Sequence, residues 1–167
     1  EAETSLLDLS DSAWNPGYPS AHYHSVTFRG LKPDTLYAYR VGDGEDHWSE
    51  WIHFRTGGEE AKPFTFLYFG DAQNGVLSHW SRNIRAAYQK APDASFVIHA
   101  GDLVNDAHEE LEWGEWFKAG GWIHASVPLI PAVGNHEYRP PGPQSDAAKL
   151  ISIQWRYQFT LPVEHDL

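Results

Sequence analysis

Three short apolar segments of this sequence each end in a glycine followed by a residue that can bind a metal ion. These exits are Gly70-Asp71, Gly101-Asp102 and Gly134-Asn135-His136-Glu137. The chain has no Cys, and carboxylate, amide and imidazole groups without thiols suit Mn, Mg, Fe or Zn. Two carboxylates in a partly buried site repel each other unless cations lie between them. One Gly-Asp pair alone is more typical of a turn or a helix N-cap, but the three exits together predict a metal site.

The segments before these exits are predicted to be buried strands, at residues 64–69, 96–100 and 128–133. Their continuous apolar character is typical of strands covered on both faces. A glycine at each exit would let the backbone turn sharply. Strands that alternate with helices predict an α/β fold with a parallel sheet, in which ligands bind at the carboxyl ends of the strands. Helical spacing predicts three helices: one through Leu77, Trp80, Ile84 and Tyr88, one through Leu111, Trp116 and Phe117, and one over residues 147–157.

The first part of the chain has a pattern typical of antiparallel β-structure. Strands are predicted at residues 24–28, 36–41 and 51–55, with a hairpin turn at Gly42-Asp43-Gly44. A Pro precedes Tyr37 by four positions, which matches a tyrosine corner, where the hydroxyl bonds to upstream backbone. Small and charged residues at 56–62 then predict a linker between two domains.

The composition excludes several classes of function. The net charge is −11 and the 12 Lys and Arg are scattered, which argues against nucleic acid as a main partner. No apolar run reaches the roughly 20 residues that would cross a bilayer, so no membrane span is predicted. No leader precedes Glu1, and we therefore expect any signal peptide to lie outside this sequence. Without Cys, disulfides and cysteine nucleophiles are excluded.

The order of the three exits, with Gly-Asn-His-Glu as the most specific piece, resembles the calcineurin-like metallophosphoesterase superfamily over residues 64–138. Residues 21–57 resemble the second half of a fibronectin type III sandwich, and this lead segment makes the chain most similar to a purple acid phosphatase. The resemblance implies a partial all-β fibronectin III-like sandwich followed by a partial α/β metallophosphoesterase sheet. The expected divisions are a lead domain at 1–57, a linker at 58–62 and the N-terminal half of the catalytic domain at 63–167.

The resemblance also implies roles for the exit residues. Asp71 would bind the first of two metal ions, Asp102 would bridge both, and Asn135 would bind the second. His136 would face the phosphate and stabilise charge in the transition state. The metals would be Fe, Zn, Mn or Mg, and a hydroxide held by them would attack phosphorus in line. The implied activity is an acid phosphatase-like phosphomonoesterase acting on a phosphate ester, in a protein that is secreted, periplasmic or at the cell surface.

Two positions depart from the purple enzymes or their relatives. Purple enzymes have a metal-binding Tyr where this chain has Asn105, so we expect a colourless protein. Non-purple relatives have an Asp there that orients the histidine. We expect Asn105 or Asp106 to take that role through a hydrogen bond to His136. Gln73 stands where those relatives have a His, and its oxygen is either a weak ligand or a simple hydrogen-bond partner.

The histidine motifs that complete such metal sites do not follow Glu137, and His165 lacks their pattern. We therefore expect an N-terminal fragment or one product of a nicked chain, whose remaining ligands come from the C-terminal part of the same protein; the alternatives are that the remainder is disordered or lies in another chain. Alone, it should bind metal poorly and be inactive. A phosphodiesterase acting on nucleotides or phospholipids and a non-catalytic adhesion module are the alternatives. The cluster of Trp113, Trp116 and Trp122, like His99, is predicted to belong to the core rather than to a substrate pocket.

Overall fold

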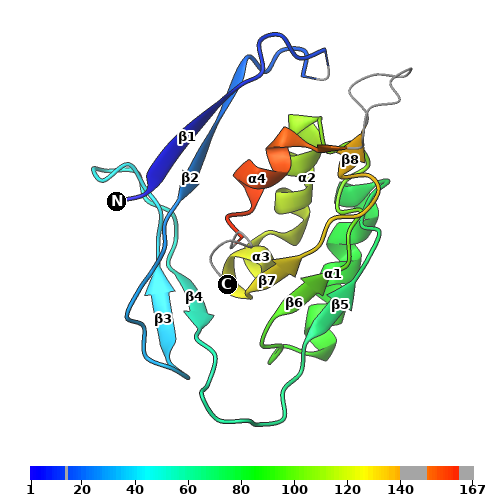
Figure 1. Cartoon of the computed structure of the whole chain (residues 1–167). Helices are drawn as coiled ribbons and strands as arrows, with labels where there is room; N and C mark the ends of the chain where they lie inside the picture. Colours follow the sequence, from blue (N-terminus) through cyan, green and yellow to red (C-terminus); the bar gives the residue numbers. More distant parts are fainter. Residues whose placement is uncertain (14, 140–149, 162–167) are drawn as a thin grey trace.

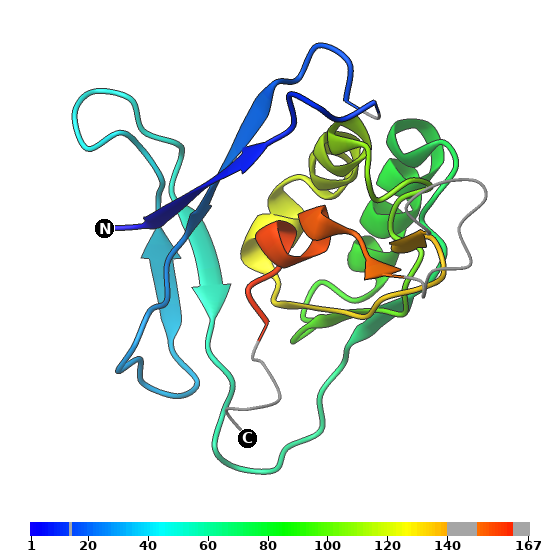
Figure 2. The same ribbon diagram turned by 45° about the horizontal axis from the view of Figure 1, so that its top comes forward.

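The computed structural model describes residues 1–13, 15–139 and 150–161. Its first part consists of two antiparallel hairpins, which lie along one side of an α/β unit in both Figure 1 and Figure 2. The hairpin strands are β1 (Glu3–Asp8) with β2 (Ser20–Ser25), and β3 (Leu36–Tyr39) with β4 (Ile52–Arg55). Residues 56–66 then connect the hairpins to the α/β unit without a helix or strand. We call residues 1–55 the hairpin unit.

The tyrosine corner is confirmed, because the backbone N–H of Lys32 donates to the Tyr37 hydroxyl at 2.8 Å. The β3–β4 hairpin is also confirmed, and a bridge between Gly42 and Trp48 extends it toward its turn. Two predictions for the first hairpin are wrong. β1 was not expected, and the strand predicted at 24–28 lies at 20–25. Only one residue of β1 is buried, so this strand has no apolar alternation and is defined by its pairing with β2.

The α/β unit has a three-stranded parallel sheet in the order β5-β6-β7. Its strands are β5 (Leu67–Phe69), β6 (Val97–His99) and β7 (Leu129–Pro131). Between them lie the π-helical turn η1 (Val76–Trp80) and the helices α1 (Ser81–Lys90), α2 (Glu110–Gly120) and α3 (Trp122–Ser126). Phe69, His99 and Pro131 are aligned across the sheet, so the three strands end at one edge as predicted.

The segment after β7 differs from the predicted third helix. It forms β8 (Tyr138–Arg139), which pairs with β9 (Leu150–Ile151), and then α4 (Ile153–Gln158). The Ser152 hydroxyl accepts a hydrogen bond from the N–H of Trp155 at the start of α4. This N-cap starts the helix later than position 147, since the preceding residues pair as a strand. Positions 147–149 of the prediction lie outside the described residues.

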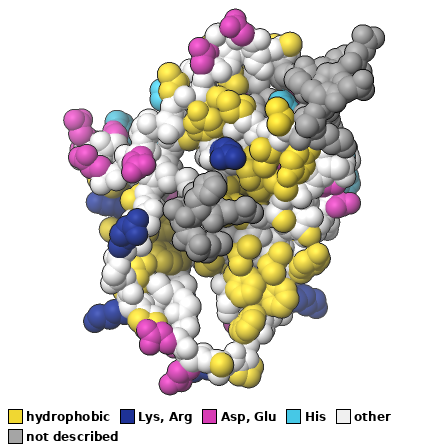
Figure 3. All heavy atoms as spheres, in the orientation of Figure 1, with side chains coloured by type: hydrophobic (Ala, Val, Ile, Leu, Met, Phe, Trp, Pro, Cys, Tyr) yellow, Lys and Arg dark blue, Asp and Glu magenta, His cyan; other side chains and the backbone are white. Residues whose placement is uncertain are grey.

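One face of the sheet packs against a core that includes Val97, Trp113 and Trp116. Both tryptophans are fully buried, which confirms their predicted core role, whereas Trp122 is 53% exposed. The expectation of strands covered on both faces is wrong for the described residues. On the second face, Tyr68 of β5 is 65% exposed, and Figure 3 shows apolar side chains gathered over this part of the molecule. The described helices are too short and too polar to cross a membrane.

Candidate metal centre

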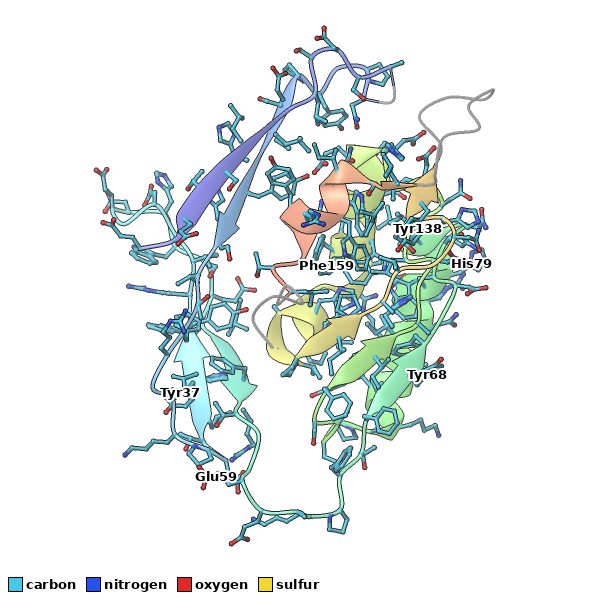
Figure 4. The ribbon with its side chains drawn as sticks, viewed as in Figure 1. Tyr37, Glu59, Tyr68, His79, Tyr138 and Phe159 are labelled. Atoms are coloured by element: carbon cyan, nitrogen blue, oxygen red, sulfur yellow. The ribbon has the colours of Figure 1, made fainter. Side chains whose placement is uncertain are left out.

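The loops that follow β5 and β6 lie side by side through backbone hydrogen bonds. The N–H of Asp71 donates to the carbonyl of Gly101 at 3.2 Å, and the N–H of Gln73 donates to the carbonyl of Asp102 at 3.3 Å. The residues predicted from the first two exits are therefore held in one place. Figure 4 labels His79, in η1, and Tyr138, in β8, on the side of the α/β unit that faces away from the hairpins.

The two aspartates have unusual backbone conformations. Asp71 has a φ of 51° and Asp102 a φ of 53°, in the left-handed region that residues other than glycine rarely adopt. Such conformations often occur at functional sites, where the surrounding structure holds them in place. At the first exit the turn is made by Asp71 itself. Gly70 has neither a positive φ nor a close neighbour, so the predicted need for a glycine is wrong at that position.

The loops after β6 and β7 approach so closely that side chains would not fit between them. A Cβ atom on Gly101 would lie 2.6 Å from the Cα of Gly134. A Cβ atom on Gly134 would in turn collide with the carboxylate of Asp102. The glycines at these two exits are therefore required by packing, and they bring the backbone of Gly134 against Asp102.

Glu137 joins the same two loops from a fully buried position, with no exposed surface. Its Oε2 accepts hydrogen bonds from the N–H groups of Gly134 at 2.6 Å and Asp102 at 2.9 Å. Its Oε1 accepts one from the N–H of Leu103 at 2.9 Å. Sequence reasoning gave Glu137 no role, because its neighbours Asn135, His136 and Arg139 are polar and nothing in the motif indicates that its carboxylate is buried.

His136 makes two contacts that set its position. Its backbone N–H donates to Oδ1 of Asp102 at 2.9 Å, and its Nδ1 lies 2.7 Å from the backbone carbonyl of Asn105. Because a carbonyl oxygen only accepts hydrogen bonds, Nδ1 must carry the hydrogen of this bond, which leaves Nε2 for other partners.

The contact that was predicted from the side chain of Asn105 or Asp106 is thus made by a main-chain carbonyl. The loop is held by Glu112, whose Oε2 accepts from the N–H groups of Asn105 at 2.7 Å and Asp106 at 2.8 Å. Asp106 is buried, and its Oδ1 accepts a hydrogen bond from the N–H of His108 at 3.1 Å. Glu112 was not identified from the sequence.

The described side chains at this edge of the sheet supply some of the ligands that a metal ion needs, but not a complete set. Asp71 and Asn135 are exposed, and Asp102 is buried to 9% exposure. Gln73 is half-buried, and its Oε1 is buried with no hydrogen-bond partner among the described residues. A buried oxygen without a donor is expected to have an ordered water or a cation as its partner. Within residues 1–13, 15–139 and 150–161, no three His, Asp or Glu side chains gather to hold a metal; His165 lies outside these ranges.

Behind the sheet edge lies an aromatic cluster that contains two histidines. His99 is fully buried, and its ring lies 5.2 Å from that of Trp80 and 6.0 Å from that of Trp116. Burial lowers the pKa of His99 to about 4. His124 stacks on Trp116 at 4.2 Å, and burial followed by the nearby His99 lowers its pKa to about 4. Both rings are therefore neutral at pH 7, and His99 occupies the predicted core position.

Comparisons with known proteins show that the chain is similar to purple acid phosphatases. The chain is similar to purple acid phosphatase 1 of Ipomoea batatas (28% identical over 129 residues) and to Fe(3+)-Zn(2+) purple acid phosphatase 12 of Arabidopsis thaliana (29% over 134 residues). In both cases the match covers 72% of this chain and 26% of the relative. The chain thus spans about a quarter of the length of these relatives. The solved structure of a purple acid phosphatase from yellow lupin (Lupinus luteus) seeds has the same fold, with a TM-score of 0.77 and 21% identity, covering 98% of this chain and 33% of that one.

Two family models match the chain. The model of the purple acid phosphatase N-terminal domain matches residues 3–56. The model of the calcineurin-like phosphoesterase matches residues 44–165, which is most of the sequence. The chain therefore belongs to the calcineurin-like phosphoesterase family, with purple acid phosphatases as its relatives.

Proposed function

We propose that this chain carries the first part of the active site of a metal-dependent phosphoric ester hydrolase, a phosphomonoesterase of the acid phosphatase type. The main support is the convergence of Asp71, Asp102 and His136 at one edge of the sheet, where hydrogen bonds and close glycine contacts hold the loops together. A site at the carboxyl ends of parallel strands is the usual location for ligand binding in such folds.

In this proposal Asp71 and Gln73 would hold one metal ion, Asn135 would hold the second through its amide oxygen, and Asp102 would contribute to both. When bound, two such ions supply a nucleophile at neutral pH and neutralise charge on the phosphoryl oxygens. The buried Oε1 of Gln73 favours a ligand role over a simple hydrogen bond. One relative carries Fe(3+) and Zn(2+) in its name, and Fe, Zn, Mn and Mg all suit oxygen-rich sites. The remaining ligands would come from the part of the protein that follows.

The chain's own contribution to proton transfer would come from His136. Since Nδ1 is engaged with the carbonyl of Asn105, Nε2 would contact the substrate and donate a proton to the leaving oxygen. A positioned general acid typically contributes about 10²- to 10⁴-fold in rate. Asn105 provides no phenolate at the position of the purple enzymes' tyrosine, so we propose a protein without a tyrosine-to-iron colour band.

We further propose the domain division 1–57, 58–62 and 63–167, with a fibronectin III-like lead domain. The absence of helix and strand over residues 56–66 supports a linker there. We also propose that the protein is exported to the periplasm, the cell surface or the medium. Phosphate esters are the proposed substrates.

The proposal is tested in the full-length protein that carries this chain, by metal analysis and by turnover of an aryl phosphate monoester and diester. We expect Asp102→Asn to lose both bound metal and activity. His136→Ala should keep its metal and lose about 10²-fold or more in kcat. Asp46→Asn, on the exposed β3–β4 turn, is the matched control and should behave as the parent. Full activity in either site variant would refute the assigned roles, and a preference for the diester would replace the monoesterase proposal.

A further inference from the structure

The hairpin unit contacts the start of α2 through Asn15, a polar residue that is only 4% exposed. Its Oδ1 accepts a hydrogen bond from the N–H of Glu110, the first residue of α2, at 2.7 Å. Its Nδ2 donates to the carbonyl of His108 at 2.8 Å. The first N–H groups of a helix need partners from outside the helix. The Glu109 side chain at the N-cap position makes no capping bond. Asn15 therefore provides one of these partners from 95 residues earlier in the chain.

A second residue of the hairpin unit reaches the same helix start. The Tyr23 hydroxyl donates to Oε2 of Glu110 at 2.6 Å, and the side chain of Gln158 in α4 donates to the Tyr23 hydroxyl at 3.2 Å. Burial, followed by Glu110, raises the pKa of Tyr23, so this hydroxyl stays a donor. Asn15, in the loop between β1 and β2, and Tyr23, in β2, thus both contact Glu110.

From the start of α2, a series of hydrogen bonds leads to the histidine of the candidate site. Glu112, in the first turn of α2, accepts hydrogen bonds from the N–H groups of Asn105 and Asp106. The carbonyl of Asn105 then accepts from Nδ1 of His136 at 2.7 Å. Each step from Asn15 to His136 is a half-buried hydrogen bond of 2.7–2.8 Å, so a shift of the helix start would move the carbonyl that orients the imidazole.

We infer that Asn15 is a positioning residue for His136: by holding the 108–110 backbone, the hairpin unit fixes the loop whose Asn105 carbonyl orients the imidazole. In this role the hairpin unit acts as a structural support of the active site. The catalytic part of this inference rests on the proposed phosphatase function, whereas the mechanical link between Asn15 and the 105–106 loop does not.

A matched control comes from another hydrogen bond between the same two parts of the chain. The Tyr39 hydroxyl donates to the carbonyl of Ala125 in α3 at 2.8 Å. Tyr39→Phe removes a contact of the same kind and length, but α3 has no described hydrogen bond to residues 105–106. The comparison separates support of this loop from a general stabilisation of the two parts against each other.

The experiment compares Asn15→Ala and Tyr39→Phe in the full-length protein, by amide hydrogen exchange under native conditions and by steady-state kinetics. For Asn15→Ala we expect exchange at the amides of Asn105 and Asp106 to accelerate about 10-fold or more, with the amides of α1 unchanged. We expect kcat to fall about 10-fold while KM changes less than about 2-fold, because small misplacement of a catalytic group affects the transition state most. Tyr39→Phe should leave both readouts within about 2-fold.

Asn15→Asp provides the rescue, since it keeps the acceptor for the N–H of Glu110 and loses the donor to the His108 carbonyl and the Ser12 hydroxyl. It should restore part of the protection at Asn105 and Asp106, and it replaces Asn15→Ala if the alanine variant does not fold. Equal exchange at these amides in the Asn15 and Tyr39 variants overturns the inference, whatever the activity. If the parent protein hydrolyses no phosphate ester, the proposed function fails, and the exchange result still decides the link between Asn15 and the loop.

Discussion

Glu137 provides a sharp test of how the candidate site is held together, because one buried carboxylate joins two of its three loops. It accepts hydrogen bonds from the backbone N–H groups of Asp102, Leu103 and Gly134, at 2.9, 2.9 and 2.6 Å. The side chain has no exposed surface, so these hydrogen bonds are shielded from water. The substitutions Glu137→Gln and Glu137→Ala remove its bonding capacity in two steps.

The expected losses in the free energy of unfolding follow from the number of N–H groups left without an acceptor. In Glu137→Gln the amide oxygen can replace Oε2 and keep the bonds to Asp102 and Gly134, but its NH₂ group then faces the N–H of Leu103. One unsatisfied N–H and the loss of charge-assisted bonding should cost about 2–4 kcal/mol. In Glu137→Ala all three N–H groups lose their acceptor, at about 1–3 kcal/mol each. Such a loss is comparable to the typical total stability of a domain, about 5–15 kcal/mol.

Urea unfolding followed by tryptophan fluorescence measures these losses, since Trp113 and Trp116 are fully buried in the core of the α/β unit. Glu59→Gln, at an exposed linker position labelled in Figure 4, is the control and should change the stability by less than about 0.5 kcal/mol. Amide exchange at Asp102, Leu103 and Gly134 should accelerate in Glu137→Gln. A stability within about 0.5 kcal/mol of the parent would refute the reasoning that Glu137 holds the two loops together.

Three further predictions concern single residues. Asn105→Ala should leave the orientation of His136 and the activity within about 2-fold of the parent, because the contact comes from the main chain; a larger loss in kcat would assign the role to the side chain. Tyr37→Phe should lower the free energy of unfolding by about 1 kcal/mol, measured by urea unfolding, since it removes the bond to Lys32; no change would mean that water replaces this bond. His99 has its pKa lowered to about 4 by burial, so the unfolded chain binds more protons than the folded chain between pH 4 and 6.5. The free energy of unfolding should therefore be highest above about pH 6.5 and fall by roughly 3 kcal/mol as the pH drops to 4. In His99→Phe the free energy of unfolding should depend less steeply on pH across this range. An unchanged pH profile in that variant would contradict the assignment.

Much of the fold and the family could be predicted because the signals are local in the sequence. The apolar segments before Asp71, Asp102 and Asn135 are short and end in glycine, which is enough to indicate strands of a parallel sheet. The Pro and Tyr37 spacing predicted a hydrogen bond that the structure contains. β1 could not be predicted, because its residues are mostly exposed and its strand geometry depends on pairing with β2.

The sequence by itself determined which chemical groups follow each strand, since a parallel sheet brings the carboxyl ends of its strands to one edge whatever the details of packing. Only the tertiary structure decided how these groups are held. The carbonyl of Asn105, the buried carboxylate of Glu137 and the side chain of Asn15 act through backbone groups distant in the sequence. Hydrogen bonds to the main chain do not depend on the identity of the partner residue, so no spacing or residue type in the sequence could reveal them.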